Sequence, residues 1–144
     1  MKNAKLTRRI SLGTLLGILA GVLCFAGFAS NTDMPTDMAQ WQVWSWSNGM
    51  MWSTIINRMV LGQVVALAGF MMFHPIFGFR LSPWLRGMKV GFLISLPMAV
   101  GALMNSDPQA AKAGFWIVLV MGTIIGLIID VVITKFSGEG EELM

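Results

Sequence analysis

Apolar residues run along this chain in four long blocks that are separated by polar segments. The blocks cover residues 10–29, 52–74, 88–104 and 114–133. A membrane-spanning helix needs about 20 mostly apolar residues, because it rises about 1.5 Å per residue across roughly 30 Å of hydrocarbon. The pattern therefore predicts an all-α membrane protein with four transmembrane helices in one domain, residues 1–136, followed by an acidic, disordered tail at residues 137–144.

The composition supports the same class of protein. The chain has 144 residues, of which 56% are hydrophobic and 12% are charged, whereas ordinary globular proteins have about 45–50% and about 25%. A soluble fold of this size could not bury so much apolar surface. The net charge of +3 does not indicate a nucleic-acid partner, because the basic residues flank the apolar blocks and do not gather on one soluble face.

The first apolar block allows two interpretations. Basic residues followed by an apolar run are typical of a signal peptide, and Gly27-Phe28-Ala29 offers a small-x-small cleavage site. However, the run covers 20 residues at positions 10–29, and a secretory signal has an apolar run of only about 7–15. The length favours a retained first helix.

A Trp-rich segment connects the first two predicted helices. Asp37 and Gln40 have the spacing of a helix N-cap and its third residue, so a short surface helix is expected there. Tryptophan favours the headgroup level, where its apolar ring and its polar N–H both find partners. We expect four tryptophans to act as interfacial anchors; the alternative is an aromatic pocket for a quinone or another cofactor. The four are Trp41, Trp44, Trp46 and Trp52.

Basic residues predict the orientation by the positive-inside rule. If four helices alternate across the membrane, only Lys112 lies outside and only Arg58 lies within a helix. The other basic residues all fall on one side: Lys2, Lys5, Arg8, Arg9, Arg80, Arg86, Lys89 and Lys135. We therefore expect a multi-pass protein of the bacterial plasma membrane with both termini in the cytoplasm.

Small residues share one face of each predicted helix when successive residues are placed about 100° apart. In lipid no hydrophobic force drives helices together, so close backbone approach supplies much of the attraction. We expect helix packing through eight glycines, which leaves little room for a pore within one chain. They are Gly13, Gly17, Gly21, Gly62, Gly87, Gly91, Gly122 and Gly126.

Arg58 and Asp130 continue the small faces of the second and fourth helices, and Asn57 and Gln63 lie close to Arg58 in sequence. These four residues form the candidate intramembrane polar site, because a charge within hydrocarbon is costly and needs a reason. Counted along the helices, Arg58 lies about 9 Å inside the outer end and Asp130 about 7 Å inside the inner end. A core of about 30 Å leaves roughly 14 Å between them along the membrane normal, which argues against a direct pair.

Other partners lie nearer to each charge. On the outer side Arg58 can pair with an acidic residue or reach a lipid phosphate by snorkelling; a substrate or proton site is a third interpretation. On the inner side Asp130 can pair with a basic residue. The acidic candidates are Asp33, Asp37 and Asp107, and the basic candidates are Arg86, Lys89 and Lys135.

The residues that enzymes and cofactor sites require are scarce. His74 is the only histidine and Cys24 the only cysteine, so two-histidine metal sites, bis-histidine haem and multi-cysteine sites cannot form within one chain. Phosphate-binding glycine loops and nucleophile elbows are also missing from the sequence. We therefore expect no enzyme activity and no cofactor. Thioethers can bind Cu(I), so a remote alternative is copper handling by Met34, Met38, Met50 and Met51.

Three short patterns resemble small four-helix prokaryotic integral membrane proteins that are themselves uncharacterised. The patterns are Trp52…Asn57-Arg58…Gly62, then Arg86-Gly87-x3-Gly91-x3-Ser95-Leu96-Pro97, and then Gly122-x3-Gly126-x3-Asp130. They cover about the last two-thirds of the chain, and the resemblance implies an architecture without an activity. We expect a non-enzymatic membrane protein that acts by helix packing, as a homo-oligomer or as an accessory subunit of a larger membrane complex. The alternative is a small transporter or channel component that uses Arg58 or Asp130.

Overall fold

The computed structural model describes residues 3–31, 43–74 and 76–143 of the chain. Four long α-helices account for most of this part, and all four are long and apolar enough to cross a membrane. They are α1 (Asn3–Asn31), α3 (Gly49–Ala68), α4 (Pro83–Ala102) and α5 (Pro108–Ser137), followed by a 3₁₀ turn, η1 (Gly140–Leu143). The predicted all-α fold with four helices of membrane-spanning length is confirmed.

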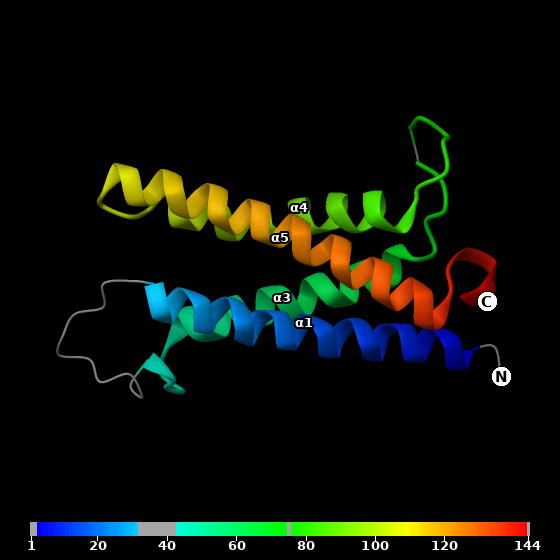
Figure 1. Ribbon diagram of the computed structural model, residues 1–144, viewed down its shortest axis with the longest axis horizontal. Coiled ribbons are helices and arrows are strands. Elements are labelled where there is room, and N and C mark those ends of the chain that lie inside the picture. The colour runs from blue at the N-terminus through cyan, green and yellow to red at the C-terminus, as the bar shows by residue number, and fades with distance from the viewer. Residues whose placement is uncertain (1–2, 32–42, 75, 144) are drawn as a thin grey trace.

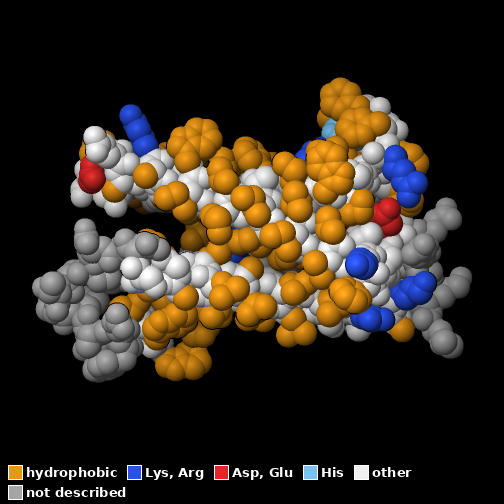
Figure 2. Space-filling model, in the orientation of Figure 1, with side chains coloured by type: hydrophobic (Ala, Val, Ile, Leu, Met, Phe, Trp, Pro, Cys, Tyr) orange, Lys and Arg blue, Asp and Glu red, His pale blue; other side chains and the backbone are white. Residues whose placement is uncertain are grey.

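The helices form two antiparallel hairpins, α1 with α3 and α4 with α5 (Figure 1). Near the end that holds both chain termini, α5 crosses from its own hairpin toward α1, and the two hairpins meet there (Figure 1). At the opposite end they diverge, and a notch separates them on the face drawn in Figure 2. The end with the termini is therefore where the hairpins hold each other.

The second helix begins and ends earlier than the apolar block predicts. Asn48 caps α3, because its side-chain oxygen accepts hydrogen bonds from the backbone N–H groups of Met50 and Met51. The helix ends at Ala68, so the predicted end at residue 74 is wrong. Beyond it the chain folds back on itself, with the Leu81 N–H donating to the Met72 carbonyl at 2.7 Å. Apolar residues after Ala68 thus belong to a loop.

The third and fourth helices begin five and six residues before their predicted starts at residues 88 and 114. Each has a proline in its first turn, Pro83 in α4 and Pro108 in α5. Proline suits this position because its φ is fixed near the helical value and the N–H it lacks would have no intrahelical partner. Asp107 also caps α5 through the N–H groups of Gln109 and Ala110. Pro97 lies inside α4, which continues through it.

The C-terminal residues differ from the disordered tail that the sequence suggests. α5 continues to Ser137 and ends at Gly138, whose φ of 79° is in the left-handed region that glycine adopts easily. The Gly140 N–H then donates to the Gly69 carbonyl at 2.9 Å. Leu143 is only 2% exposed. One buried leucine and one long-range backbone bond thus hold a segment whose composition alone reads as unstructured.

Glycine contacts lie mainly within the two hairpins. A Cβ built on Gly13 would come within 2.5 Å of the Gly62 carbonyl oxygen, so α1 and α3 approach backbone to backbone. Likewise, a Cβ on Gly87 or Gly91 would collide with the backbone of α5 at Gly126 or Gly122. Gly17 and Gly21 face the α3 backbone in the same way.

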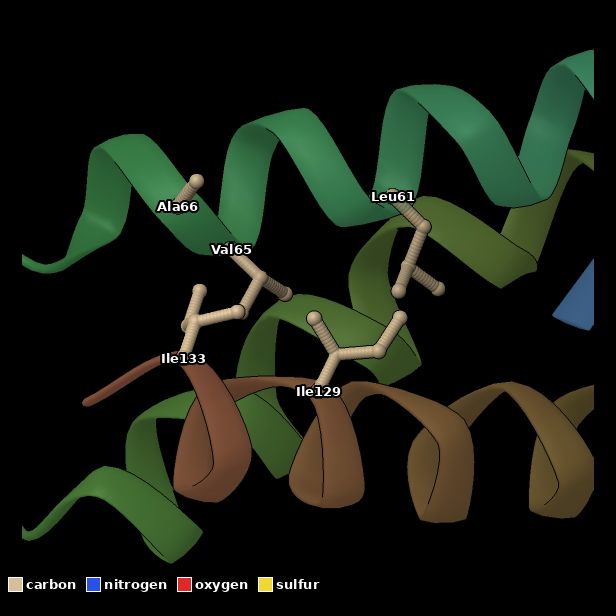
Figure 3. Close-up of a cluster of buried hydrophobic side chains, with 5 residues drawn as sticks. All are labelled: Leu61, Val65, Ala66, Ile129 and Ile133. Carbon is tan, nitrogen blue, oxygen red and sulfur yellow. The ribbon is translucent and has the colours of Figure 1, made fainter. Parts of the chain in front are cut away.

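Larger side chains fill the space between the hairpins. Leu61 and Val65 point from α3 toward Ile129 and Ile133 of α5, with Ala66 beside them (Figure 3). All five are at most 3% exposed. Backbone contact therefore joins the helices of each hairpin, and side-chain packing joins one hairpin to the other.

Candidate functional site

Three charged side chains are buried where the hairpins meet. Arg9 of α1 and Asp130 of α5 are 0% exposed, and Arg86 of α4 is 2% exposed. Arg9 Nη2 lies 2.6 Å from Asp130 Oδ1, and Arg86 Nε lies 2.7 Å from Asp130 Oδ2. One carboxylate thus carries two guanidinium groups, and the three residues come from three different helices.

The Arg9 side chain bonds to several segments of the chain. Its Nε donates to the Ala66 carbonyl of α3 at 2.9 Å. Its Nη1 donates to Thr134 Oγ1 at 3.0 Å and to the Gly138 carbonyl at 2.5 Å. With the bond to Asp130, this one side chain connects α1 to α3, to α5 and to the residue that ends α5. It therefore bridges the two hairpins directly.

The Asp130 carboxylate accepts four hydrogen bonds. Besides the two bonds above, Oδ1 accepts from Arg86 Nη2 at 3.0 Å and from Thr134 Oγ1 at 3.1 Å. Three of the four donors bond to Oδ1 and one bonds to Oδ2. Because charge-assisted bonds of this kind are the strong ones, the carboxylate is held by its neighbours and is not open to a ligand.

Local sequence explains why Arg9 points inward. Arg9, Gly13, Gly17, Gly21 and Phe25 follow at steps of four, and each is buried. Residues four apart lie on the same helix face, so the arginine continues the glycine stripe of α1. Gly69, directly after α3, packs against the Arg9 guanidinium, which would have to shift to admit a Cβ there.

Two further side chains extend the network toward the end of the molecule. Glu139 Oε2 accepts from Arg86 Nη1 at 2.9 Å, and Glu139 Oε1 lies 3.4 Å from Arg80 Nη2. The Glu139 side chain is 17% exposed and that of Arg80 is 67% exposed. Solvent exposure along the network thus increases from the buried Asp130 to the exposed Arg80.

Arg58 lies in a second buried polar site, nearer the middle of the helices. It is 2% exposed, and Nη1 donates to Ser95 Oγ of α4 at 2.6 Å. Its other contacts are long, 3.4 Å to Asn57 Oδ1 and 3.4 Å to the Val118 carbonyl. Within the described residues Nε has no hydrogen-bond partner and the guanidinium pairs with no carboxylate.

The partners that the sequence offers for Arg58 have different outcomes. Asp107 caps α5 with both of its oxygens and is exposed, so it does not pair with Arg58. Asp33 and Asp37 lie outside the described residues. The 2% exposure of Arg58 leaves it inside the bundle, so snorkelling to a lipid phosphate is not its conformation here. Gln63 is half-buried on α3 and is not among the groups that bond to Arg58 in the described part of the chain.

Arg58 and Asp130 belong to separate sites, as their depths indicate. The Arg58 guanidinium packs against Gly122 of α5, and Asp130 follows eight residues later, a separation of about 12 Å along the helix. Asp130 pairs with Arg86, one of the three partners that the sequence offers for it. Of the other two, Lys89 lies 2.6 Å from His74 Nε2 and Lys135 is exposed.

Three of the predicted tryptophan anchors lie together around the end of α1 and the start of α3. Trp44 packs edge-on against Phe25 with ring centroids 4.9 Å apart, and Trp46 lies 5.0 Å from Trp52. The Trp52 N–H donates to the Trp46 carbonyl at 3.1 Å. Trp41 lies outside the described residues.

The residues of the copper alternative lie partly outside the described part of the chain. Met34 and Met38 lie outside the described residues, whereas Met50 is exposed and Met51 is buried at the start of α3. Among the described residues, no three His, Cys, Asp or Glu side chains lie close enough to hold a metal ion.

Sequence reasoning missed Arg9, Thr134 and Glu139. The positive-inside pattern accounts for Arg9 as a cytoplasmic flank, although its position four residues before Gly13 places it on the inward face. Glu139 falls in the predicted tail, and a polar threonine near a helix end carries no signal of its own. Comparison of the chain with protein-family models, with curated proteins and with solved structures finds no match.

Proposed function

We propose that this chain is a non-enzymatic, multi-pass membrane protein of the bacterial plasma membrane that acts through helix packing, as a homo-oligomer or as an accessory subunit. The observation that carries the proposal is an arrangement with charges inside and apolar groups outside. The buried polar residues include Arg9, Arg58, Arg86 and Asp130. Over the middle of the bundle, the face drawn in Figure 2 is covered by hydrophobic side chains. Lipid, not water, is the solvent that suits such a surface.

The outward-facing side chains of α5 illustrate this surface. Trp116, Ile117, Val120, Ile124 and Ile128 are each more than 45% exposed. A soluble monomer rarely exposes a continuous apolar strip of this length. In a bilayer the same strip contacts lipid acyl chains or a helix of another subunit. These contacts keep the strip away from water.

The orientation follows from where the basic side chains lie. Lys5, Arg8, Arg80 and Lys135 are exposed at the end with the termini, and Lys112 is exposed at the other end. The positive-inside rule therefore puts both termini in the cytoplasm. It also puts Trp44, Trp46 and Trp52 at the outer interface, where tryptophan is favoured as an anchor.

The buried ion network supports a packing role over a reactive one. Asp130 is 0% exposed and its carboxylate accepts four hydrogen bonds, so a substrate has no access to it from solvent. A fixed network of this kind defines one relative position of the two hairpins and presents a constant outer surface. Such a surface is what a homo-oligomer or an accessory subunit offers to its neighbour.

The test is the state of the protein extracted from native membranes in a mild detergent. We expect a discrete homo-oligomer, or a stoichiometric complex with another membrane protein, by size-exclusion chromatography with light scattering and by cross-linking before extraction. A chain that stays monomeric in both measurements, with no stoichiometric partner, would contradict the proposal.

Arg58 carries the second candidate function, a small transporter or channel component. The supporting observation is a guanidinium that is 2% exposed, has an unpaired Nε and pairs with no carboxylate among the described residues. A site of this kind suits a permeating anion. Anion flux into proteoliposomes that is lost in Arg58→Gln and kept in Ser82→Ala would favour this function. No flux above that of protein-free vesicles would exclude it.

A further inference from the structure

The loop between α3 and α4 is unusually apolar for a segment outside the helices. Its sequence, residues 69–82, includes four phenylalanines and two methionines and has no acidic residue. At its tip Ile76 is 81% exposed and Phe77 is 73% exposed, and Phe73 and Phe79 are exposed as well. Exposed apolar side chains that gather in one segment mark a surface that contacts lipid or another protein.

The backbone N–H groups at the tip of this loop are all bonded to one residue, His74. The His74 Nδ1 atom accepts hydrogen bonds from the N–H groups of Ile76 and Phe77, each at 3.2 Å. The Gly78 N–H donates to the His74 carbonyl at 2.9 Å. An unpaired N–H is costly next to lipid, where no water can bond to it. The tip therefore presents apolar side chains without donors that need water.

Further contacts of His74 fix the shape of the loop. Its ring centroid lies 4.9 Å from that of Phe77 and 5.1 Å from that of Phe79. Its backbone N–H donates to the Phe79 carbonyl at 2.8 Å, and its Nε2 lies 2.6 Å from Lys89 Nζ of α4. The loop is thus attached to α4 and holds its apolar tip away from the bundle in one conformation.

The lengths of α3 and α4 place the loop at the edge of the hydrocarbon. Each helix has 20 residues and is therefore about 30 Å long, which matches the hydrocarbon core of a bilayer. The loop extends sideways past α4, across the direction of the helices (Figure 1). Hydrophobic side chains surround the histidine at this corner of the molecule (Figure 2). A loop that runs sideways stays at the depth where it leaves the helices, so its tip meets the lipid interface.

The residues at the base of the loop favour lipid over a protein partner. Arg80 faces Phe73 across an antiparallel β-bridge, and its side chain is 67% exposed. Trp84, the second residue of α4, is 51% exposed. Tryptophan is favoured at the headgroup level, and a long basic side chain can reach from an apolar surface to lipid phosphates. Apolar residues combined with such flanks are typical of segments that lie in the membrane interface.

We propose that the tip of the α3–α4 loop inserts into the lipid interface at the end of the molecule that holds the termini. Ile76 and Phe77 are the inserted side chains, and His74 is the positioning residue that holds the tip in shape. The inference rests on the membrane placement proposed above, and it goes beyond the packing function because it names a lipid contact outside the helices. Irregular backbone is not tolerated within the hydrocarbon, so the insertion is shallow.

The experiment measures the depth of a nitroxide label at residue 77 of the full-length protein in phospholipid vesicles. The label is attached to Phe77→Cys in a background with Cys24→Ala. Its collisions with oxygen, which partitions into lipid, are compared with its collisions with a water-soluble nickel complex. We expect a depth of about 5–10 Å into the boundary between headgroups and acyl chains. Lys135→Cys is the matched control, because Lys135 is exposed in the last turn of α5; its label should collide mainly with the nickel complex.

Two substitutions of His74 test its part in the insertion. His74→Ala removes the acceptor of two N–H groups at the tip, so the label at residue 77 should lose its depth and collide more often with the nickel complex. Asparagine can accept from the N–H two residues on, so His74→Asn should keep the depth although its side chain is too short to keep the contact with Lys89. Equal depths in the two variants would overturn the role assigned to His74.

The collision data also distinguish the other environments that the tip could have. A label at residue 77 that meets the nickel complex as often as the label at residue 135 would place the tip in water and overturn the proposal. A label that neither oxygen nor nickel reaches would be covered by protein, a second copy included, and would overturn it as well. Extraction of the protein from the vesicles by alkaline carbonate would contradict the membrane placement itself. That result differs from a water-exposed tip in a protein that the vesicles retain.

Discussion

Replacing Asp130 with asparagine should weaken the contact between the two hairpins and lower the free energy of unfolding. The carboxylate accepts four hydrogen bonds, at 2.6, 2.7, 3.0 and 3.1 Å. Asparagine keeps one acceptor oxygen and presents an NH₂ group to donors, so at least one arginine loses its contact. Arg9 and Arg86 also lose the counter-charge that offsets their burial. Removing one partner of a buried ion pair costs about 3–5 kcal/mol, and the two stranded guanidiniums favour the upper half of that range.

The assay for Asp130→Asn is reversible unfolding in mixed micelles, followed by far-UV circular dichroism and tryptophan fluorescence. Glu139→Gln is the matched control, because it also neutralises one carboxylate in contact with Arg86 but at a side chain that is 17% exposed. Arg86 keeps its two bonds to Asp130 in the control, so we expect the control to lose only about 1–2 kcal/mol. A loss in Asp130→Asn of less than about 1 kcal/mol, or one no larger than in Glu139→Gln, would refute the claim that the buried network holds the hairpins together.

Three further substitutions test local features by the same unfolding assay. Gly13→Ala places a Cβ 2.5 Å from the Gly62 carbonyl oxygen and should lower the free energy of unfolding by about 1–3 kcal/mol. In the control Gly27→Ala, the new Cβ meets nothing within 4 Å, so the change should be neutral or stabilising by up to about 1 kcal/mol. Equal effects of the two substitutions would contradict the close approach of α1 and α3. Ser95→Ala removes the 2.6 Å hydrogen bond from Arg58 and should lower the free energy of unfolding by about 1.5–3 kcal/mol. The control is Ser82→Ala, because the Ser82 side chain makes no capping hydrogen bond; it should lower the free energy of unfolding by less than about 0.5 kcal/mol. Asn48→Ala should cost about 1 kcal/mol, because two N–H groups at the start of α3 lose their acceptor; an unchanged stability would show that this cap does not contribute.

The helices could be found from the sequence because lipid imposes a length that composition reveals. The helix ends were less predictable, because a helix does not begin and end where the apolar residues begin and end. Pro83 and Pro108 begin helices several residues before the apolar blocks predicted there. At residue 69 the opposite happens, and apolar residues continue after the helix has ended. At the two helix starts, proline in the first turn decides the boundary.

The candidate site was predictable where one helix face carries the information. Asp130 continues the glycine line of its helix, and Arg86 follows as a partner because both lie near the same end. Arg9 was missed because a basic residue before an apolar block already has an explanation in the positive-inside rule. Its inward direction depends on its place on the stripe of Gly13 and Gly17. The pairing of Glu139 with Arg86 depends on a chain reversal after Gly138 that composition does not reveal.

The central claim is that the chain spans the bilayer with the ion network and both termini on the cytoplasmic side. Its most direct test is labelling of single cysteines by a membrane-impermeant maleimide in intact cells, in a background where Cys24 is replaced by alanine. Lys112→Cys should react without permeabilisation, and Lys5→Cys and Lys135→Cys should react only after it. Reaction of Lys5→Cys or Lys135→Cys in intact cells, or protection of Lys112→Cys, would contradict the account.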